Sequence, residues 1–311
     1  MHQICDRCER RSAYYRKYSG ESLCGKCFSL SLREKVVKTI SKYSMIEYGD
    51  KIAVAVSGGK DSLSLLHIIV PFCKKHGNDV CAVTIDEGID GYREESIEIV
   101  SKFTSLIGIE HKVFSYKELF GASLEESLQL RKGKKMSSCS ICGTFRRRAI
   151  DIAAESVNAN VIATAHNLDD SLQTFLINIL AGDVERIGWT YPEPIAYSGN
   201  LRKIKPLGEI YEHEIAFYAL INEIPFQSEE CPHMNEGIRT KIREFLNKLE
   251  DEHSGIKYNA YSTLVKIAKK VRESSAKPRN RCILCRRDST NNICSVCSMT
   301  ITLRENAKMQ I

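Results

Sequence analysis

The sequence predicts an α/β protein with a central parallel sheet wrapped by helices and a small cysteine-rich module at each end. Three observations support this fold class. Short apolar runs alternate with helical stripes through the middle of the chain, a glycine-containing loop follows the first apolar run, and paired cysteines occur near both termini. We expect an N-terminal module at residues 1–30, a central domain with a linking helix at 31–250, and a C-terminal helix and module at 251–311.

The composition is that of a globular protein and excludes several other classes. The 311 residues include 45 Lys plus Arg and 39 Asp plus Glu, which gives a net charge of +6, and 43% are hydrophobic. This balance excludes a histone-like polycation, a disordered chain and a collagen-like repeat. The longest weakly polar run, 62–73, is too short to span a bilayer, and residues 1–5 lack the pattern of a signal peptide. We therefore expect a cytoplasmic protein without a membrane partner.

Eight of the thirteen cysteines form two sets of paired thiols. A reducing cytosol disfavours disulfides, so clustered thiols are better interpreted as metal ligands. Two pairs, each with two residues between its cysteines, complete a closed tetrahedral zinc site in a segment too small for its own core. No position is left open for chemistry, so both sites are predicted to be structural. The N-terminal set is Cys5, Cys8, Cys24 and Cys27, and the C-terminal set is Cys282, Cys285, Cys294 and Cys297.

Residues 57–62 form a loop between the first strand and the first helix of the predicted sheet. The apolar run 52–56 leads directly into this loop, and a buried helical stripe begins at Leu63. The start of a helix offers unpaired backbone N–H groups and the positive end of the helix dipole, the two glycines let a phosphate approach the backbone, and Lys60 adds a positive charge. Together they predict a phosphate-binding loop. It is not a Walker A loop, because Lys60 is followed by Asp61 instead of Ser or Thr. An ordinary glycine turn is the alternative.

Further elements alternate in the order that a parallel sheet requires. We expect strands at 80–85, 111–114 and 161–165, and helices with apolar stripes at 97–107, 149–157 and 172–180. In such sheets ligands bind beyond the carboxyl ends of the strands, so the loops 57–62, 86–88 and 166–170 should face one crevice. Other helical stripes, which we interpret as core, lie at 32–43, 215–219, 238–249 and 261–271.

Two adjacent carboxylates, Asp169 and Asp170, lie where the helix after the strand at 161–165 begins. Beside bound phosphates they would hold Mg²⁺, which prefers oxygen ligands. The alternative is that one of them is the N-cap of that helix.

A third cysteine pair, Cys139 and Cys142, has no second pair nearby, and Cys231 is the other cysteine in a conspicuous setting. Three thiolates can hold a [4Fe-4S] cluster with one iron uncovered, or a redox-active pair with a third thiol can carry sulfur as a persulfide. The residues alone leave both alternatives open. Cys73 and Cys81 are interpreted as small core residues.

Basic residues are clustered although the net charge is modest. Such clusters suit a phosphate-rich partner, and their place beside small zinc modules favours RNA. Solvated faces are the alternative for any single cluster. The clusters lie at 131–135, 146–148, 202–205 and 266–281.

These motifs together resemble a known family. Residues 57–62 are similar to the SGGKDS signature of the PP-loop ATP pyrophosphatases, which adenylate a substrate and release pyrophosphate. Residues 139–147, 166–170 and 230–232 resemble the tRNA 2-thiouridine synthetases of the TtuA, Ncs6 and Ctu1 group, and the resemblance covers essentially the whole chain. It implies a Rossmann-like parallel sheet, ATP with Mg²⁺, two structural Zn²⁺ ions, a tRNA substrate and a homodimer.

The resemblance also implies roles for particular residues. Cys139, Cys142 and Cys231 would hold a [4Fe-4S] cluster, although other members of the group have been viewed as persulfide carriers. Lys60, Arg146 and Asp170 would be catalytic. ATP would lie across three strand ends, with its adenine near Ile85, and contact Ser57, Gly58, Gly59, Lys60, Asp61, Ser62, Ile85, Asp86, Thr164, His166, Asp169 and Asp170.

Three positions depart from the family pattern without removing a ligand. Ala165 stands where Gly is often found before the His, Arg146 stands where some members have Lys, and the first zinc set is all cysteine where a His is sometimes used.

The implied reaction replaces the C2 oxygen of a tRNA uridine, at position 34 or 54, by sulfur. Adenylation turns an inert carbonyl into one that sulfide can replace, with AMP as leaving group. The sulfur would come from a ubiquitin-like protein thiocarboxylate or from free sulfide. Two rivals are a PP-loop enzyme that attaches nitrogen, which leaves the three lone cysteines without a role, and a non-catalytic RNA-binding zinc protein that senses nucleotide.

Overall fold

The computed structural model describes residues 4–130, 137–197, 200–229, 231–233, 238–274 and 280–308. The predicted basic cluster at 131–135 lies outside these ranges, as do residue 230 of the motif at 230–232 and residues 275–279 of the cluster at 266–281. Within the described ranges, no helix has the length and apolar character needed to cross a membrane.

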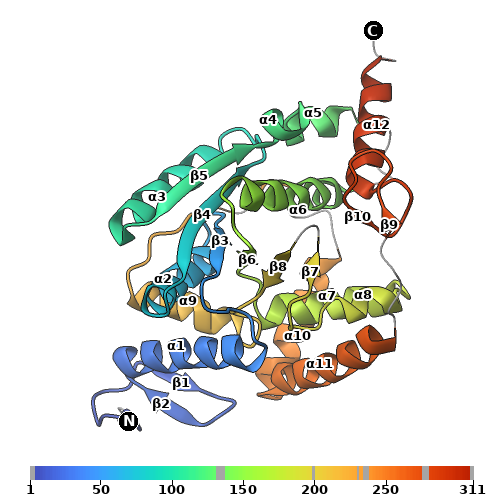
Figure 1. Cartoon of the computed structure of the whole chain (residues 1–311). Coiled ribbons are helices and arrows are strands. Elements are labelled where there is room, and N and C mark those ends of the chain that lie inside the picture. The colour runs from blue at the N-terminus through green and yellow to red at the C-terminus, as the bar shows by residue number, and fades with distance from the viewer. Residues whose placement is uncertain are drawn as a thin grey trace.

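A six-stranded sheet forms the centre of the molecule, with helices on both of its faces (Figure 1). The strand order is β5-β4-β3-β6-β8-β7, in which β7 is antiparallel to β8 and the other strands are parallel. Strands β3, β4 and β5 are added towards one edge of the sheet, whereas β6 and β8 are added towards the other. The loops that follow the neighbouring strands β3 and β6 therefore diverge and leave room for a ligand. The strands are β3 (Lys51–Ala55), β4 (Asp79–Asp86), β5 (Glu110–Ser115), β6 (Val161–Ala163), β7 (Ala196–Tyr197) and β8 (Leu201–Ile204).

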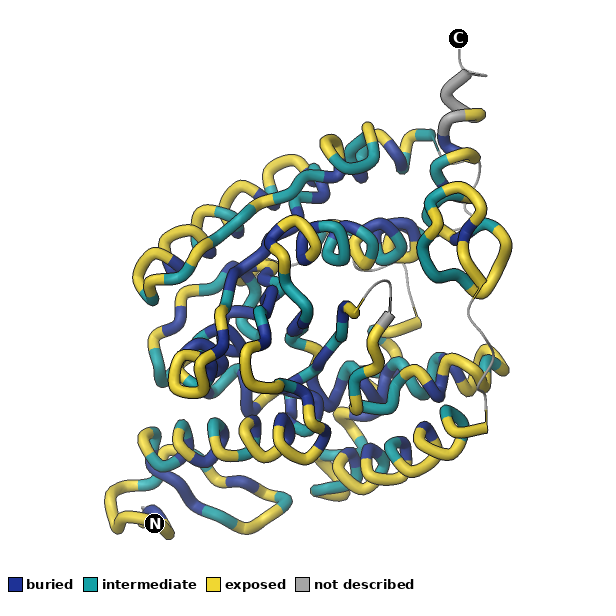
Figure 2. Tube along the Cα trace, viewed as in Figure 1, coloured by how far each residue is buried: buried dark blue, intermediate teal, exposed yellow. Residues whose placement is uncertain are grey.

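Two apolar cores lie on the two faces of this sheet, because successive strand side chains point to opposite faces. Ile52 and Val54 of β3 belong to one core, and Ala53 belongs to the other. Figure 2 shows buried segments along the strands and the inner sides of the helices. The first core is covered by α1 (Gly25–Lys42), α2 (Lys60–Lys75), α3 (Arg93–Ile107) and α9 (Glu212–Ile221), and the second by α4 (Tyr116–Phe120), α5 (Leu124–Gln129), α6 (Ser138–Ser156) and α12 (Ser295–Lys308).

Four further helices form a third core beside the sheet. They are α7 (Leu168–Leu180), α8 (Val184–Gly188), α10 (Arg239–Glu252) and α11 (Ile256–Ser274). Gly188 lets α8 approach α11 closely, since a Cβ there would lie 3.2 Å from the backbone nitrogen of Arg272. These helices carry the apolar stripes predicted at 172–180, 238–249 and 261–271.

Each cysteine-rich module contains one short hairpin. In the N-terminal module β1 (Tyr14–Arg16) pairs with β2 (Glu21–Leu23), and in the C-terminal module β9 (Asn280–Arg281) pairs with β10 (Asp288–Ser289). The boundary expected at residue 30 falls inside α1, because Cys24 is the N-cap of this helix and Cys27 lies in its first turn. The N-terminal module and the central domain therefore share a helix.

Sequence reasoning did not identify strand β8, which lies next to the edge of the sheet. Residues 202–205, predicted as a surface basic cluster, lie largely in β8, where Leu201 and Ile204 are buried and the residues between them are half-buried. So short a strand has no apolar run by which it could be recognised. The strand predicted at 161–165 ends at Ala163, and the helix predicted from 149 begins at Ser138, so the Cys139 pair lies on a helix.

The starts of three parallel strands are held by one buried carboxylate, Asp50. The Asp50 carboxylate accepts from Arg202 at 2.6 and 2.7 Å and from the Asn160 amide at 2.6 Å. Its side chain is 4% exposed, whereas Glu47, which also contacts Arg202, is 68% exposed.

We expect Asp50→Asn to lower the free energy of unfolding by about 3–5 kcal/mol, because it leaves Arg202 largely buried without its charge partner. Urea denaturation of the purified protein measures this change. The control is Glu47→Gln, which should cost less than about 1 kcal/mol because an exposed pair contributes little. Equal losses in the two variants would contradict this account of the sheet.

Candidate active site

The glycine loop lies between β3 and α2 and is closed by contacts on both sides. Ser62 Oγ accepts from the Ser57 N–H at 3.2 Å and donates to the Gly59 carbonyl at 2.9 Å. The Gln227 N–H donates to the Gly58 carbonyl at 3.0 Å. The N-cap, Gly59, offers no side-chain acceptor, so the first turn of α2 keeps backbone N–H groups for an anion.

Gly58 is required by both the conformation and the packing of this loop. Its φ of 86° lies in the left-handed region. A Cβ at this position would lie 2.7 Å from the Cβ and 2.9 Å from the carbonyl oxygen of Ser96 in α3. The loop is therefore pressed against a helix backbone that cannot rotate away.

Two carboxylates lie beside Lys60, whose Nζ is 2.9 Å from Glu212 Oε1 and 3.5 Å from Asp61 Oδ1. A third carboxylate, Asp170, interacts electrostatically with Asp61. Burial, together with the negative charges of Glu212 and Asp170 and against the opposing effect of Lys60, raises the pKa of Asp61 to about 7. A divalent cation would relieve this repulsion, so the site suits Mg²⁺. Glu212 was not found from the sequence, because it comes to the loop from a distant helix.

The two adjacent carboxylates at the start of α7 differ in their surroundings. The N-cap is Asn167, so the interpretation of Asp169 or Asp170 as the N-cap is wrong; Asp170 exchanges capping-box hydrogen bonds with Asn167. Asp169 accepts from Lys257 Nζ at 2.6 Å and from the Glu212 N–H at 2.8 Å. Both Asp169 oxygens are thus engaged within the protein, which favours Asp61, Asp170 and Glu212 as cation ligands. The predicted contact of Asp169 with ATP stays a prediction.

A chain of charged groups joins the glycine loop to Cys142. Arg93 donates to the Ser57 carbonyl at 3.1 Å and the Ile85 carbonyl at 2.6 Å, at the ends of β3 and β4. Its Nε lies 2.8 Å from one oxygen of Glu87, whose other oxygen accepts from Arg146 at 2.7 Å. Arg146 also donates to Cys142 Sγ at 3.1 Å. Glu87 and Arg93 were missed by sequence reasoning, since both are buried and their pairing is set by the fold.

Arg146 and the pair Cys139 and Cys142 lie on one face of α6, since spacings of three and four residues bring side chains together on a helix. Burial raises the pKa of Cys142, and the charge of Cys231 adds to this effect. Cys231 packs against the same apolar core as Cys142. Three soft thiols from two segments therefore lie on one side of the sheet.

The segment that carries Cys231 is tied back to both neighbouring helices. Cys139 Sγ donates to the His233 carbonyl at 3.5 Å, and the His233 ring lies 2.7 Å from a Glu125 oxygen in α5. The three sulfurs do not form a group within 4.8 Å of one another, unlike the two sets of four cysteines. They are therefore not arranged around one shared ion; in a [4Fe-4S] cluster each thiolate would bind a different iron.

Cations surround the ends of β6 and β8. His166 is exposed to solvent, and its Nδ1 and Thr164 Oγ1 form a hydrogen bond of 2.9 Å. Desolvation by the surrounding protein, together with four cations, lowers the pKa of His166 to about 3, so the ring is neutral. The cationic group comprises Lys205, Arg239, Arg146 and Arg147. Such a group of cations attracts polyanions.

The remaining residues that are predicted to contact ATP lie at the carboxyl ends of strands. Ile85 and Asp86 close β4, where Asp86 Oδ1 accepts from the Gly88 N–H at 2.8 Å. Thr164 follows β6, and its N–H donates to the Ile204 carbonyl at 3.0 Å. The structure therefore brings the predicted loops 57–62, 86–88 and 166–170 to the same edge of the sheet.

Both predicted metal sets are brought together by the fold. Within each set of four cysteines the sulfurs lie within 4.8 Å of one another. Backbone N–H groups of Cys294 and Cys285 lower the pKa of Cys282 to about 6, which favours the thiolate that a metal requires. Arg148 of α6 lies 3.6 Å from Cys285 Sγ and 3.7 Å from Cys294 Sγ. Four thiols around one point suit zinc.

This sheet, the glycine loop at its switch point and the convergent carboxylates define a PP-loop protein. A family model described as the PP-loop domain matches residues 31–250. A second model, the N-terminal LIM domain of the 2-thiouridine synthetase TtuA, matches residues 4–29. The chain belongs to the TtuA, Ncs6 and Ctu1 family within the PP-loop superfamily.

Individual relatives agree over nearly the whole chain. Cytoplasmic tRNA 2-thiolation protein 1 of Saccharomyces cerevisiae is 32% identical over 320 residues, which cover 99% of this chain and 88% of the relative. The protein of the same name from Chlamydomonas reinhardtii is 39% identical over 251 residues, 80% of this chain and 70% of the relative. The U34-tRNA thiolase NcsA of Methanococcus maripaludis, solved with its [4Fe-4S] cluster, is similar with a TM-score of 0.83 at 29% identity and covers 96% of each chain.

We expect Gly58→Ala to destabilise the protein by about 1–3 kcal/mol or more, because it combines left-handed backbone strain with a clash against α3. Gly59→Ala is the matched control, since Gly59 is extended and its added Cβ would meet its closest neighbour, Ser57 Oγ, at 3.6 Å. Urea denaturation without nucleotide compares the two. A similar loss in both variants would show that the Ser96 contact is not the cause.

The raised pKa of Asp61 makes its contribution to the stability of the protein depend on pH. Its pKa of about 7 in the folded protein exceeds the ordinary value of 3.8, so the folded state binds this proton more tightly. The contribution of Asp61 to stability therefore falls as pH rises from about 4 to about 7. Asp61→Asn removes this term, so the stability of the variant relative to the native protein should increase over that range in urea denaturation without added Mg²⁺. Parallel pH profiles would contradict the assigned shift; the pH 4 measurement, where the folded Asp61 is neutral, is the control.

Proposed function

We propose that this protein is an ATP-dependent tRNA-uridine 2-sulfurtransferase, which replaces the C2 oxygen of a tRNA uridine by sulfur. The observation that carries this proposal is the contact of Arg146 with both Glu87 and Cys142. Through Arg93, Glu87 is joined to the glycine loop, so a short chain of polar contacts connects the proposed nucleotide site with the lone cysteines. Membership of the TtuA, Ncs6 and Ctu1 family supports the same activity.

ATP would bind with its phosphates at residues 57–62 and its adenine near Ile85. The first turn of α2 supplies N–H groups to the phosphates, and Lys60 adds a positive charge. Asp61, Asp170 and Glu212 would hold Mg²⁺ between themselves and the phosphates.

The activation step uses the uridine C2 oxygen as nucleophile. The oxygen forms a bond to the α-phosphorus of ATP, and pyrophosphate leaves with the electron pair of the broken P–O bond. Sulfide then adds at C2, and AMP departs with the former C2 oxygen, which leaves a C=S group. Lys60 and Arg146 would stabilise the negative charge that develops on the transferring phosphate.

Cys139, Cys142 and Cys231 would hold a [4Fe-4S] cluster. When bound, such a cluster has one iron without a protein ligand, and this iron can present sulfide to the activated base. Arg146 offsets the negative charge at Cys142, and Tyr116, which donates to the Cys142 carbonyl at 2.8 Å, fixes the start of α6. A persulfide on the Cys139 pair without a cluster is the alternative.

The same proposal assigns the remaining partners. The cationic group around His166 would bind the tRNA backbone, and two Zn²⁺ ions would occupy the two sets of four cysteines. The sulfur donor would be a ubiquitin-like protein thiocarboxylate or free sulfide, and the protein would act as a homodimer. A PP-loop enzyme that attaches nitrogen would have no use for the contact between Arg146 and Cys142.

Reconstitution tests this function. The protein, loaded anaerobically with iron and sulfide, is incubated with ATP, Mg²⁺, sulfide and tRNA, and the tRNA is digested for nucleoside mass spectrometry. We expect 2-thiouridine at position 34 or 54, with AMP and pyrophosphate formed only when tRNA is present. Absence of these products would favour a nucleotide-sensing RNA-binding protein.

Replacement of one lone cysteine separates sulfur transfer from nucleotide binding. Cys231→Ser should abolish 2-thiouridine formation and the iron absorption of the loaded protein while leaving the Kd for ATP within about twofold. Cys81→Ala, which removes a buried core thiol in β4, is the control and should retain both iron and activity. Thiolation by Cys231→Ser would exclude Cys231 as a ligand.

A further inference from the structure

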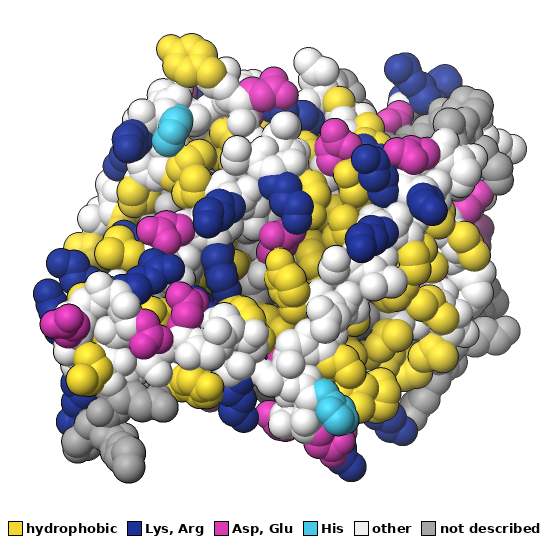
Figure 3. All heavy atoms as spheres, turned by 90° about the horizontal axis from the view of Figure 1, so that it is seen from below, with side chains coloured by type: hydrophobic (Ala, Val, Ile, Leu, Met, Phe, Trp, Pro, Cys, Tyr) yellow, Lys and Arg dark blue, Asp and Glu magenta, His cyan; other side chains and the backbone are white. Residues whose placement is uncertain are grey.

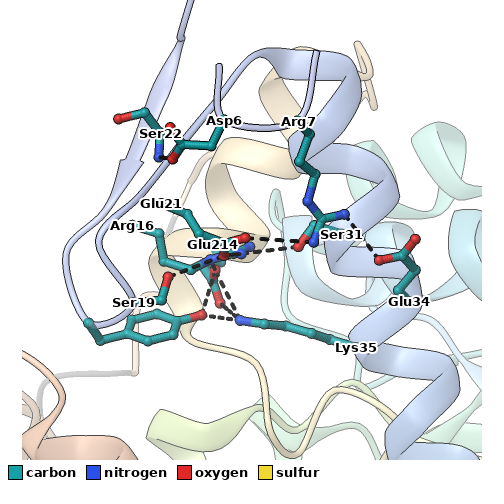
Figure 4. A network of polar contacts seen from close by, with 11 residues as sticks. Asp6, Arg7, Arg16, Ser19, Glu21, Ser22, Ser31, Glu34, Lys35 and Glu214 are labelled. Carbon is teal, nitrogen blue, oxygen red and sulfur yellow. Dashed lines mark hydrogen bonds and ion pairs between the residues drawn. The ribbon is translucent and has the colours of Figure 1, made fainter. Parts of the chain in front are cut away.

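A buried carboxylate, Glu214 in the first turn of α9, joins the N-terminal module to the body of the protein (Figure 4). Its side chain is 0% exposed. Glu214 Oε1 accepts from Arg16 Nε at 2.7 Å and from the Tyr18 hydroxyl at 3.0 Å, and Lys35 Nζ lies 3.4 Å from Oε2. An isolated carboxylate at this depth would be costly, so this position depends on the cations that the module and α1 supply.

Arg16 is itself fixed by the module. Its side chain is 1% exposed, and its NH1 donates to Glu21 at 2.7 Å and to Ser31 at 3.0 Å. Because the guanidinium is planar, these bonds on one side determine the direction in which Nε meets Glu214. The Tyr18 ring stacks on Tyr211, the N-cap of α9, with centroids 5.0 Å apart. The module thus holds both the cap and the first turn of α9.

The same turn of α9 reaches the glycine loop on its other side. Glu212 lies two residues before Glu214, and side chains with this spacing point to opposite sides of a helix. Glu212 Oε1 lies 2.9 Å from Lys60 Nζ, and its N–H donates to Asp169 at 2.8 Å. One turn of helix is therefore held by the module and in turn holds the lysine of the loop.

We infer that the N-terminal module positions Glu212, a proposed cation ligand, and with it Lys60 for ATP through the first turn of α9, with Arg16 and Glu214 as positioning residues. Lys60 has a second partner, Asp61, at 3.5 Å. When Glu212 shifts, Lys60 moves towards Asp61 and neutralises a carboxylate that would otherwise bind the cation. This inference rests on the proposed ATP-binding role of residues 57–62.

The test measures binding of a non-hydrolysable ATP analogue with Mg²⁺ to the full chain by calorimetry. Glu214→Gln should raise the Kd roughly tenfold, the size expected for loss of one charge-assisted hydrogen bond, and Glu212→Gln should raise it at least as much, because it removes a proposed cation ligand as well as the partner of Lys60. Because Glu214 acts through Glu212, the double variant should bind no more weakly than Glu212→Gln alone. A purely structural effect of Glu214 would give additive losses.

Glu209→Gln is the matched control. Glu209 lies just before α9 and pairs with Lys42 Nζ at 2.5 Å and with the Tyr43 hydroxyl at 2.9 Å, away from Lys60. The Kd of the Glu209→Gln variant for the ATP analogue should stay within about twofold of the native value. Arg16→Lys, which keeps the charge but loses the planar fork, tests the same link if Glu214→Gln does not fold, and it should also weaken binding several-fold.

The outcomes separate the two proposals. A native Kd in Glu214→Gln or Arg16→Lys, with two equivalents of bound zinc showing that the modules are intact, would overturn the positioning role alone. Absence of analogue binding by the native protein would overturn the proposed function and this inference with it.

Discussion

The arrangement of the active site depends on one buried carboxylate shared by two arginines. Glu87 receives Arg93 on one oxygen and Arg146 on the other, and its side chain is 4% exposed. Arg93 binds the carbonyls that end β3 and β4, whereas Arg146 extends to the sulfur of Cys142. Loss of Glu87 would leave two cations facing each other, so this carboxylate holds the loop and the cysteines in their relation to each other.

Helix α6 contributes to both the proposed cluster site and the predicted C-terminal zinc site. Its first two turns carry Cys139 and Cys142, and Arg146 continues the same face one turn later. Arg148 points away from that face to the sulfurs of Cys285 and Cys294 in the C-terminal module. Because the helix is rigid over this length, the C-terminal module and the lone cysteines hold a fixed relation to each other.

The sequence predicted what depends on local spacing and missed what depends on distant pairing. The glycine loop and the grouping of the two sets of four cysteines were predicted correctly, because each follows from a pattern of residues close together in the sequence. Glu212 and Lys257 were missed, since their partners Lys60 and Asp169 lie 152 and 88 residues away. The N-cap alternative for Asp169 or Asp170 was wrong because Asn167 takes that position, and β8 was missed because it is short and basic.

The link between Arg16 and Glu214 has a consequence for synthesis of the chain. These two residues are separated by 198 positions, so the arginine leaves the ribosome long before its carboxylate partner exists. Until then the amino-terminal hairpin has no place to dock, and the lysine after the paired glycines has no counter-ion from α9. A nascent chain can therefore complete its nucleotide site only after most of its length has been translated.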